Sequence, residues 1–128
     1  MSENSVTIAA WRAAVQDDSG KRFAELVHED VVIEGSVFAT PIAGRDAVRN
    51  AIRQSSGLYD RLDFTHETQS NDRTYFEWEG AALGLALWGV TAICVGSDGR
   101  ITGVVLSHRP LEVVNKFAAA LADRLARH

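Results

Sequence analysis

Apolar residues recur with the period of an α-helix in four parts of the chain. A first helix is expected near the N-terminus after a cap at Asn4 or Ser5, and a short second helix from Lys21. A third occupies residues 45–57, and a fourth follows Pro110, whose ring suits the first turn of a helix. The apolar positions that define these helices are Ile8, Trp11, Ala14 and Val15, then Phe23, Leu26 and Val27, then Val48 and Ile52, and finally Leu111, Val114, Phe117, Ala118, Leu121 and Leu125.

Between the helices, apolar and polar residues alternate as they do along β-strands. One strand is expected over residues 30–39, bent or bulged at Gly35 and followed by a loop. Four further segments, at residues 62–70, 73–80, 85–95 and 100–108, form an antiparallel meander. Helices before and after such a meander predict an α+β fold, in which one face of the sheet is buried against helices.

A tight turn at Asp98-Gly99 predicts the register of the last two strands. It pairs Gly89 with His108 and Thr91 with Leu106. Because side chains alternate between the faces of a strand, one face then holds Leu87, Thr91, Ile93, Val104, Leu106 and His108. His108 therefore stands at the end of an apolar strand, immediately before the last helix.

A second turn at Asn71-Asp72 pairs His66 with Glu77 in the other hairpin. One face of this hairpin carries Phe64, His66, Tyr75, Glu77 and Glu79, and the opposite face carries Thr65, Glu67, Phe76 and Trp78. Residues 80–84, which join the two hairpins, do not determine which of these faces continues the face of His108.

Composition narrows the class of protein. The 128 residues, 46% apolar and 23% charged, suit one globular domain that covers residues 1–128. A net charge of −4 without a basic cluster argues against a nucleic-acid partner, and no apolar stretch approaches the roughly 20 residues of a membrane span. With Cys94 as the only cysteine and no signal-peptide pattern, we expect a cytoplasmic protein without metal or cofactor.

Two stretches carry a family resemblance. The sequence FAELVHEDVVIEGSVFATPIAGRDAVRNAI, with GRITGVVL later, resembles the nuclear transport factor 2-like superfamily in its SnoaL-like polyketide cyclase and ketosteroid isomerase branch. The resemblance covers residues 8–109 and implies a cone-shaped α+β barrel with an apolar pocket, commonly in a homodimer. Its members include isomerases, cyclases, dehydratases and epoxide hydrolases, and also non-catalytic binding domains, so the fold does not determine the chemistry.

The ketosteroid isomerase residues are not retained in this chain. By the same resemblance, the isomerase tyrosine falls on Trp11, the catalytic base on Gly35 and the oxyanion-binding aspartate on Thr91. An indole cannot act as a phenol does, and glycine cannot accept a proton. The isomerase mechanism therefore does not carry over, although other chemistry in the same pocket remains open.

A candidate site follows from the strand faces together with the resemblance, which places Glu77 inside the pocket. The expected catalytic residues are His108, Glu77 and His66, and the expected substrate-binding residues are Trp11, Tyr75, Leu87, Thr91 and Leu106. An imidazole beside a carboxylate can serve as a general acid and base. If the last helix directs its N-terminus at His108, the helix dipole favours the neutral imidazole. The alternatives are a structural strand–helix junction for His108 and a solvated cross-strand pair for His66 and Glu77.

These residues predict a small enzyme that needs no cofactor. Its ligand is expected to be an apolar, oxygenated molecule, and the resemblance suggests a polyketide- or terpenoid-like substrate for an isomerase, cyclase or dehydratase. The alternative is a non-catalytic ligand-binding or dimeric interaction domain. A homodimer is expected because large apolar residues occur on both parities of the meander, with Phe76, Trp78 and Trp88 set against Leu87 and Ile93.

Overall fold

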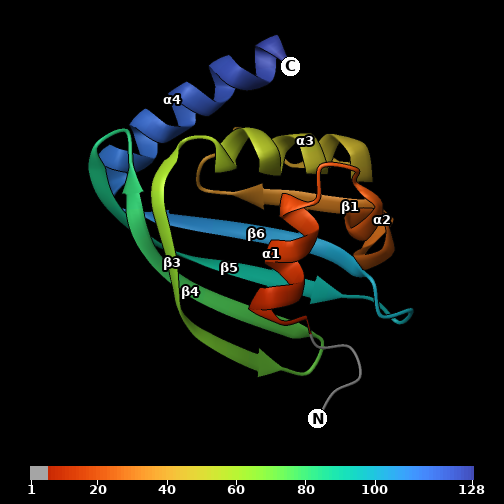
Figure 1. Cartoon of the computed structure of the whole chain (residues 1–128). Coiled ribbons are helices and arrows are strands. Elements are labelled where there is room, and N and C mark those ends of the chain that lie inside the picture. The colour runs from red at the N-terminus through yellow and green to blue at the C-terminus, as the bar shows by residue number, and fades with distance from the viewer. Residues whose placement is uncertain (1–5) are drawn as a thin grey trace.

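A computed structural model of the chain describes residues 6–128 and shows a strongly curved, open sheet with helices on its concave side (Figure 1). The elements, in chain order, are α1 (Ile8–Gln16), α2 (Lys21–Leu26), β1 (Val27–Gly35), β2 (Ile42–Ala43), α3 (Arg45–Ser56), β3 (Tyr59–Ser70), β4 (Arg73–Ala82), β5 (Leu85–Val95), β6 (Ile101–Arg109) and α4 (Leu111–Arg127). The predicted α+β cone with an additional C-terminal helix is confirmed.

The six strands form one sheet in the order β2-β1-β6-β5-β4-β3. Strands β3 to β6 form the expected antiparallel meander. However, β1 pairs in parallel with β6, so the sheet as a whole is mixed and only the meander is antiparallel throughout. A helix and three strands of the meander separate β1 from β6 in the chain, a connection long enough for parallel pairing. The segment expected to be a loop contains the short strand β2.

The start of α1 is fixed by two hydrogen bonds. Thr7 is its N-cap, and the Thr7 side chain accepts a hydrogen bond from the N–H of Ala10 (3.0 Å). The N–H of Ile8 donates to Glu67 Oε1 of β3 (2.8 Å), which attaches the helix to the edge strand. The caps expected at Asn4 or Ser5 lie outside the described residues.

The inner face of the sheet is determined by the turn between β4 and β5. Leu83 and Gly84 form this turn with φ values of 55° and 76°, as a two-residue hairpin loop requires. The resulting register sets Phe76 opposite Thr91 and Trp78 opposite Gly89. The face of Phe76 and Trp78 is thus the continuation of the face of His108. The placement of Glu77 inside the pocket is wrong.

Apolar side chains on the inner face form two clusters. One lies beneath α1, α2 and α3, and its larger members include Trp11, Phe23, Ile33, Phe76 and Ile93. The other joins α4 to the inner face and includes Trp78, Leu87, Val114, Phe117 and Leu121. Helix α4 thereby covers one end of the cone, alongside α3 (Figure 1).

The outer face of the sheet is less apolar than the sequence pattern suggested. Phe76 and Trp78 lie on the same inner face as Leu87 and Ile93, so only Trp88 of the five residues points outward, where it is 40% exposed. Of the large apolar residues expected on both faces, the outer face therefore carries only Trp88. No helix among residues 6–128 has the length and apolar character needed to cross a membrane.

Candidate functional site

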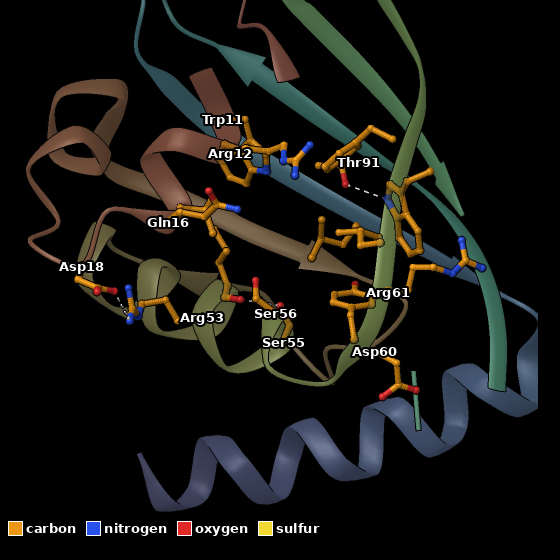
Figure 2. Close-up of a pocket in the computed structure, with 17 residues that line it drawn as sticks. Trp11, Arg12, Gln16, Asp18, Arg53, Ser55, Ser56, Asp60, Arg61 and Thr91 are labelled. Carbon is orange, nitrogen blue, oxygen red and sulfur yellow. Dashed lines mark hydrogen bonds and ion pairs between the residues drawn. The ribbon is translucent and has the colours of Figure 1, made fainter. Parts of the chain in front are cut away.

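A cavity of about 490 Å³ opens between α1, α3, β3 and the inner face of the sheet (Figure 2). Its apolar wall is formed by Trp11, Val15, Ile52, Leu62, Phe64, Trp78 and Leu106. Its polar lining consists of Arg12, Gln16, Asp18, Arg53, Ser55, Ser56, Tyr59, Asp60, Arg61 and Thr91. The size suits a small organic ligand, and Trp11, Thr91 and Leu106, which are expected to bind substrate, line this cavity.

His108 lies on the inner face, as predicted, but behind the cavity wall rather than on it. Its ring packs against Tyr59, Trp78 and Phe117, with centroid distances of 6.0, 5.0 and 5.0 Å. Its backbone N–H donates to Ser36 Oγ (2.8 Å). The residue is only 7% exposed, and this burial lowers the pKa of His108 to about 4. The imidazole is therefore neutral near pH 7, as expected, with burial as the cause.

Tyr59 connects His108 to the cavity. This residue lines the cavity, and its hydroxyl lies 2.5 Å from Nε2 of His108. Burial raises the pKa of the Tyr59 phenol above its ordinary value, so the pair consists of two neutral groups at neutral pH. The sequence analysis missed Tyr59, because the strand was expected to begin at residue 62 and β3 begins three residues earlier.

The hydrogen bonds of His108 favour one tautomer. Nδ1 is buried and has no hydrogen-bond partner among the described residues. A proton on Nδ1 would thus be a buried donor without an acceptor, which native structures avoid more strictly than an unmatched acceptor. With the proton on Nε2, His108 donates to the Tyr59 oxygen, and the Tyr59 hydroxyl proton is left for an acceptor in the cavity.

Thr91 is a second cavity-lining hydroxyl whose oxygen accepts a hydrogen bond from a ring N–H. Trp78 Nε1 donates to Thr91 Oγ1 (3.2 Å), the bond drawn between β4 and β5 in Figure 2. Indole nitrogen can only donate, so the Thr91 oxygen is the acceptor and its own proton stays available. A Cβ on Gly89 would collide with the Trp78 ring, and the absence of that atom gives the indole its place. Thr91 and Tyr59 thus both line the cavity as hydroxyls that accept from a ring N–H.

The structure separates His66, Glu77 and Tyr75 from this cavity. His66 Nδ1 and Glu77 Oε2 are 3.3 Å apart, but their side chains are 70% and 59% exposed on the outer face of the sheet. Tyr75 has the same parity as Glu77 and is half-exposed there. Their expected catalytic and binding positions are wrong, because the register set at Leu83 and Gly84 turns this parity outward.

Leu87 is on the predicted face but does not line the cavity. It is fully buried in the cluster that α4 forms with the sheet. The long C-terminal helix covers the part of the inner face where the sequence pattern placed an open pocket wall. Leu87 therefore has a packing role.

Charged residues of the cavity lining are engaged in part with neighbouring groups. Arg53 Nη2 lies 3.1 Å from Asp18 Oδ1, and Arg61 is paired with Asp63. Asp60 accepts a hydrogen bond from the N–H of Gly84 (2.9 Å). Within residues 6–128, no three or more His, Cys, Asp or Glu side chains gather in a group that could hold a metal ion.

Gly35, the position to which the sequence resemblance assigns the isomerase base, is closed to a side chain. A Cβ on Gly35 would collide with the carbonyl oxygen of Leu106, which pairs with Gly35 across β1 and β6. No carboxylate can replace this glycine without a shift of the backbone. The close pairing of β1 with β6 thus requires glycine at this position.

Comparisons with known proteins show which solved structures share this fold. Among solved structures, it is similar to a steroid delta-isomerase from Pseudomonas aeruginosa, with a TM-score of 0.83, 20% identity and coverage of 99% of this chain and 95% of that one. A protein with a cystatin-like fold from Silicibacter pomeroyi gives a TM-score of 0.76 at 20% identity, covering 94% of this chain and 82% of that one. A ketosteroid isomerase-like fold from Catenulispora acidiphila, in complex with trimethylamine, gives 0.63 at 16% identity, with coverage of 88% and 91%.

At these identities the similarities establish the fold alone. A search of curated proteins found no match. The model of the SnoaL-like domain, by contrast, matches residues 8–104, which span α1 to the first half of β6. This chain belongs to the SnoaL-like domain family.

Proposed function

We propose that the cavity binds an apolar small molecule through a carbonyl or hydroxyl oxygen and promotes acid/base chemistry on it, of the isomerase, cyclase or dehydratase type. The observation that carries this proposal is the Tyr59–His108 hydrogen bond, which places a hydroxyl group in the cavity lining beside apolar side chains such as Leu62 and Trp78. A polyketide- or terpenoid-like molecule fits this description.

Tyr59 is the proposed donor to the ligand. In the favoured tautomer, Nε2 of His108 donates a hydrogen bond to the Tyr59 oxygen. The Tyr59 hydroxyl proton is then free to point toward the cavity. A hydrogen bond to a carbonyl oxygen becomes stronger as negative charge develops there, as it does when an adjacent carbon loses a proton to hydroxide or a buffer base that enters the cavity. Thr91, held in the same way by Trp78, is a second donor. His108 acts through Tyr59 and is a positioning residue.

A non-catalytic ligand-binding domain is the second candidate. It is favoured by Gly35, where the isomerase base is replaced by a residue that cannot carry a side chain in this fold. The two carboxylates of the cavity lining, Asp18 and Asp60, both have other partners. Binding through Tyr59 is common to both candidates, and proton abstraction distinguishes them.

Binding is tested with two matched probes, 2-acetylnaphthalene and 2-ethylnaphthalene, which differ in the carbonyl oxygen. Wild type should bind the ketone more tightly, and Tyr59→Phe should lose about 1–2 kcal/mol of that preference, the contribution of one hydrogen bond. Tyr75→Phe is the matched control, since Tyr75 lies on the outer face. Equal binding of both probes to wild type, or an unchanged preference in Tyr59→Phe, would contradict the proposal.

Catalysis is tested by hydrogen–deuterium exchange at the methyl group of the bound ketone in D₂O. An enzyme that stabilises the enolate accelerates this exchange, and Tyr59→Phe slows it. Bound ketone that exchanges no faster than in buffer identifies the protein as a binder of this probe.

A further inference from the structure

Arg12 is an exposed residue that lines the cavity and lies against the aromatic ring of Phe64. It projects from α1, and its Cζ lies 5.8 Å from the centroid of the Phe64 ring on β3. Both residues line the cavity, so the guanidinium extends from the helix toward the edge strand beside the opening (Figure 2). The cation is thereby placed against an aromatic face, an arrangement that favours a defined position over a freely moving chain.

Among residues 6–128, no carboxylate forms an ion pair with Arg12. Arg53 is paired with Asp18, and Arg61 is paired with Asp63. Glu67, on the same strand as Phe64, accepts the N–H of Ile8. Among residues 6–128, Arg12 makes no ion pair within 4.0 Å, in a chain whose net charge is −4.

The cavity lining therefore offers two kinds of polar group. Tyr59 and Thr91 offer neutral hydroxyls beside the apolar side chains of the wall, while Arg12, which is exposed, offers a cation without an ion-pair partner among residues 6–128. A guanidinium can donate to two oxygens of a carboxylate or sulfonate at once. Gln16, one turn along α1, lines the same side and adds a side-chain amide donor.

We infer that the ligand is an amphipathic acid: an apolar body inside the cavity and an anionic group held by Arg12 at the opening. This inference deepens the proposed function and rests on its assignment of the cavity as the ligand site. It narrows the substrate class from neutral oxygenated molecules to those that also carry a carboxylate or a similar anion.

Two naphthylamine probes test the inference: 8-anilino-1-naphthalenesulfonate and N-phenyl-1-naphthylamine, which differ in the sulfonate group. Both become fluorescent in apolar sites, so each dissociation constant comes from a titration. Wild type should bind the anionic probe more tightly. Arg12→Gln should reduce the ratio of the two affinities by about five-fold or more, as expected for one ion pair of about 1 kcal/mol at a partly exposed site.

Two further variants control for charge. Arg12→Lys should retain part of the preference, because it retains the cation. Arg22→Gln removes the same charge from an exposed position of α2, outside the cavity lining, and should leave the ratio unchanged. Far-ultraviolet circular dichroism verifies that each variant is folded.

The outcomes separate this inference from the proposed function. An affinity ratio that Arg12→Gln does not change, equal loss in Arg22→Gln, or no binding of either probe overturns the role of Arg12. If the Arg12 result holds while Tyr59→Phe leaves ketone binding unchanged, the anion site stands and the proposed oxygen donor fails. The reverse pattern leaves the donor intact and refutes the anion site.

Discussion

The stability of this protein should fall steeply in mild acid because His108 is buried as a neutral ring. Its pKa is lowered by burial to about 4, whereas the unfolded chain has the ordinary value of 6.5. A group with a depressed pKa in the folded state binds protons preferentially in the unfolded state. The contribution of His108 to the free energy of unfolding is therefore constant above pH 6.5, and this stability is lost as the pH falls from about 6.5 toward 4.

The size of the effect follows from the two pKa values. Each unit of pKa difference corresponds to about 1.4 kcal/mol, and most of the interval is traversed between pH 7.5 and pH 4.5. His108 protonation should thus cost about 2–3 kcal/mol of unfolding free energy over this range. For a domain whose whole stability is about 5–15 kcal/mol, such a loss is easily measured.

The assay is urea unfolding of wild type and His108→Gln at both pH values. Glutamine places an amide near the position of Nε2 and can still bond Tyr59, but it does not titrate. All other ionisable groups are common to the two proteins, so they cancel when the pH dependences are subtracted. Wild type should lose about 2–3 kcal/mol more than the variant. Parallel pH dependences would refute the assignment of His108 as a buried, neutral imidazole.

Three other predictions concern the strand pairing, the core and the outer face of the sheet. Gly35→Asp should destabilise the fold by about 3 kcal/mol or more and create no isomerase activity, because its Cβ would collide with the Leu106 carbonyl. Thermal melts measure the loss, and an unchanged melting point would contradict it. Phe117→Ala should cost about 3–5 kcal/mol and loosen Tyr59, whose ring centroid is 5.1 Å away; urea titration measures the cost, and a cost below 1 kcal/mol would contradict the packing. We propose that the outer sheet face forms a homodimer, so sedimentation at tens of micromolar should show dimers that Trp88→Glu dissociates, and monomeric wild type would refute the proposal.

Much of the fold could be predicted because its signals are local. The helices follow from apolar spacing, and the predicted pairing of Thr91 with Leu106 is present. The predicted two-residue turn at Asp98-Gly99 is wrong, because the N–H of Gly96 donates to the carbonyl of Arg100 and a register shift between Cys94 and Val95 restores the predicted pairing. The resemblance supplied the way these elements enclose a pocket. The parallel pairing of β1 with β6 joins segments far apart in the chain, and no local pattern encodes it.

The candidate site was harder to predict because it depends on two backbone irregularities. Leu83 adopts φ 55°, an uncommon conformation for a large side chain, and the resulting turn decides that Glu77 points outward. A register shift between Phe64 and His66 turns Phe64 inward, where its ring lies 5.9 Å from Phe76. The large apolar residues Phe76 and Trp78 were the available signal for the inner face.

Tyr59 could not be paired with His108 from the sequence. The two residues are 49 positions apart, and Tyr59 precedes a register shift at the start of β3. The aromatic surroundings that bury His108 come from three different elements, β3, β4 and α4. Such a site arises from tertiary packing, so the position of His108 at the end of a strand indicated only one of the residues that form it.

In the proposed function, Tyr59 donates a hydrogen bond to a ligand oxygen inside the cavity. Infrared difference spectroscopy of bound 2-acetylnaphthalene, with a ¹³C label at the carbonyl, tests it most directly, since hydrogen bonding weakens the C=O bond and lowers its stretching frequency. We predict a lower frequency in wild type than in an apolar solvent, and a return toward the apolar value in Tyr59→Phe but not in Tyr75→Phe. A carbonyl frequency that is the same in wild type and Tyr59→Phe would contradict the account.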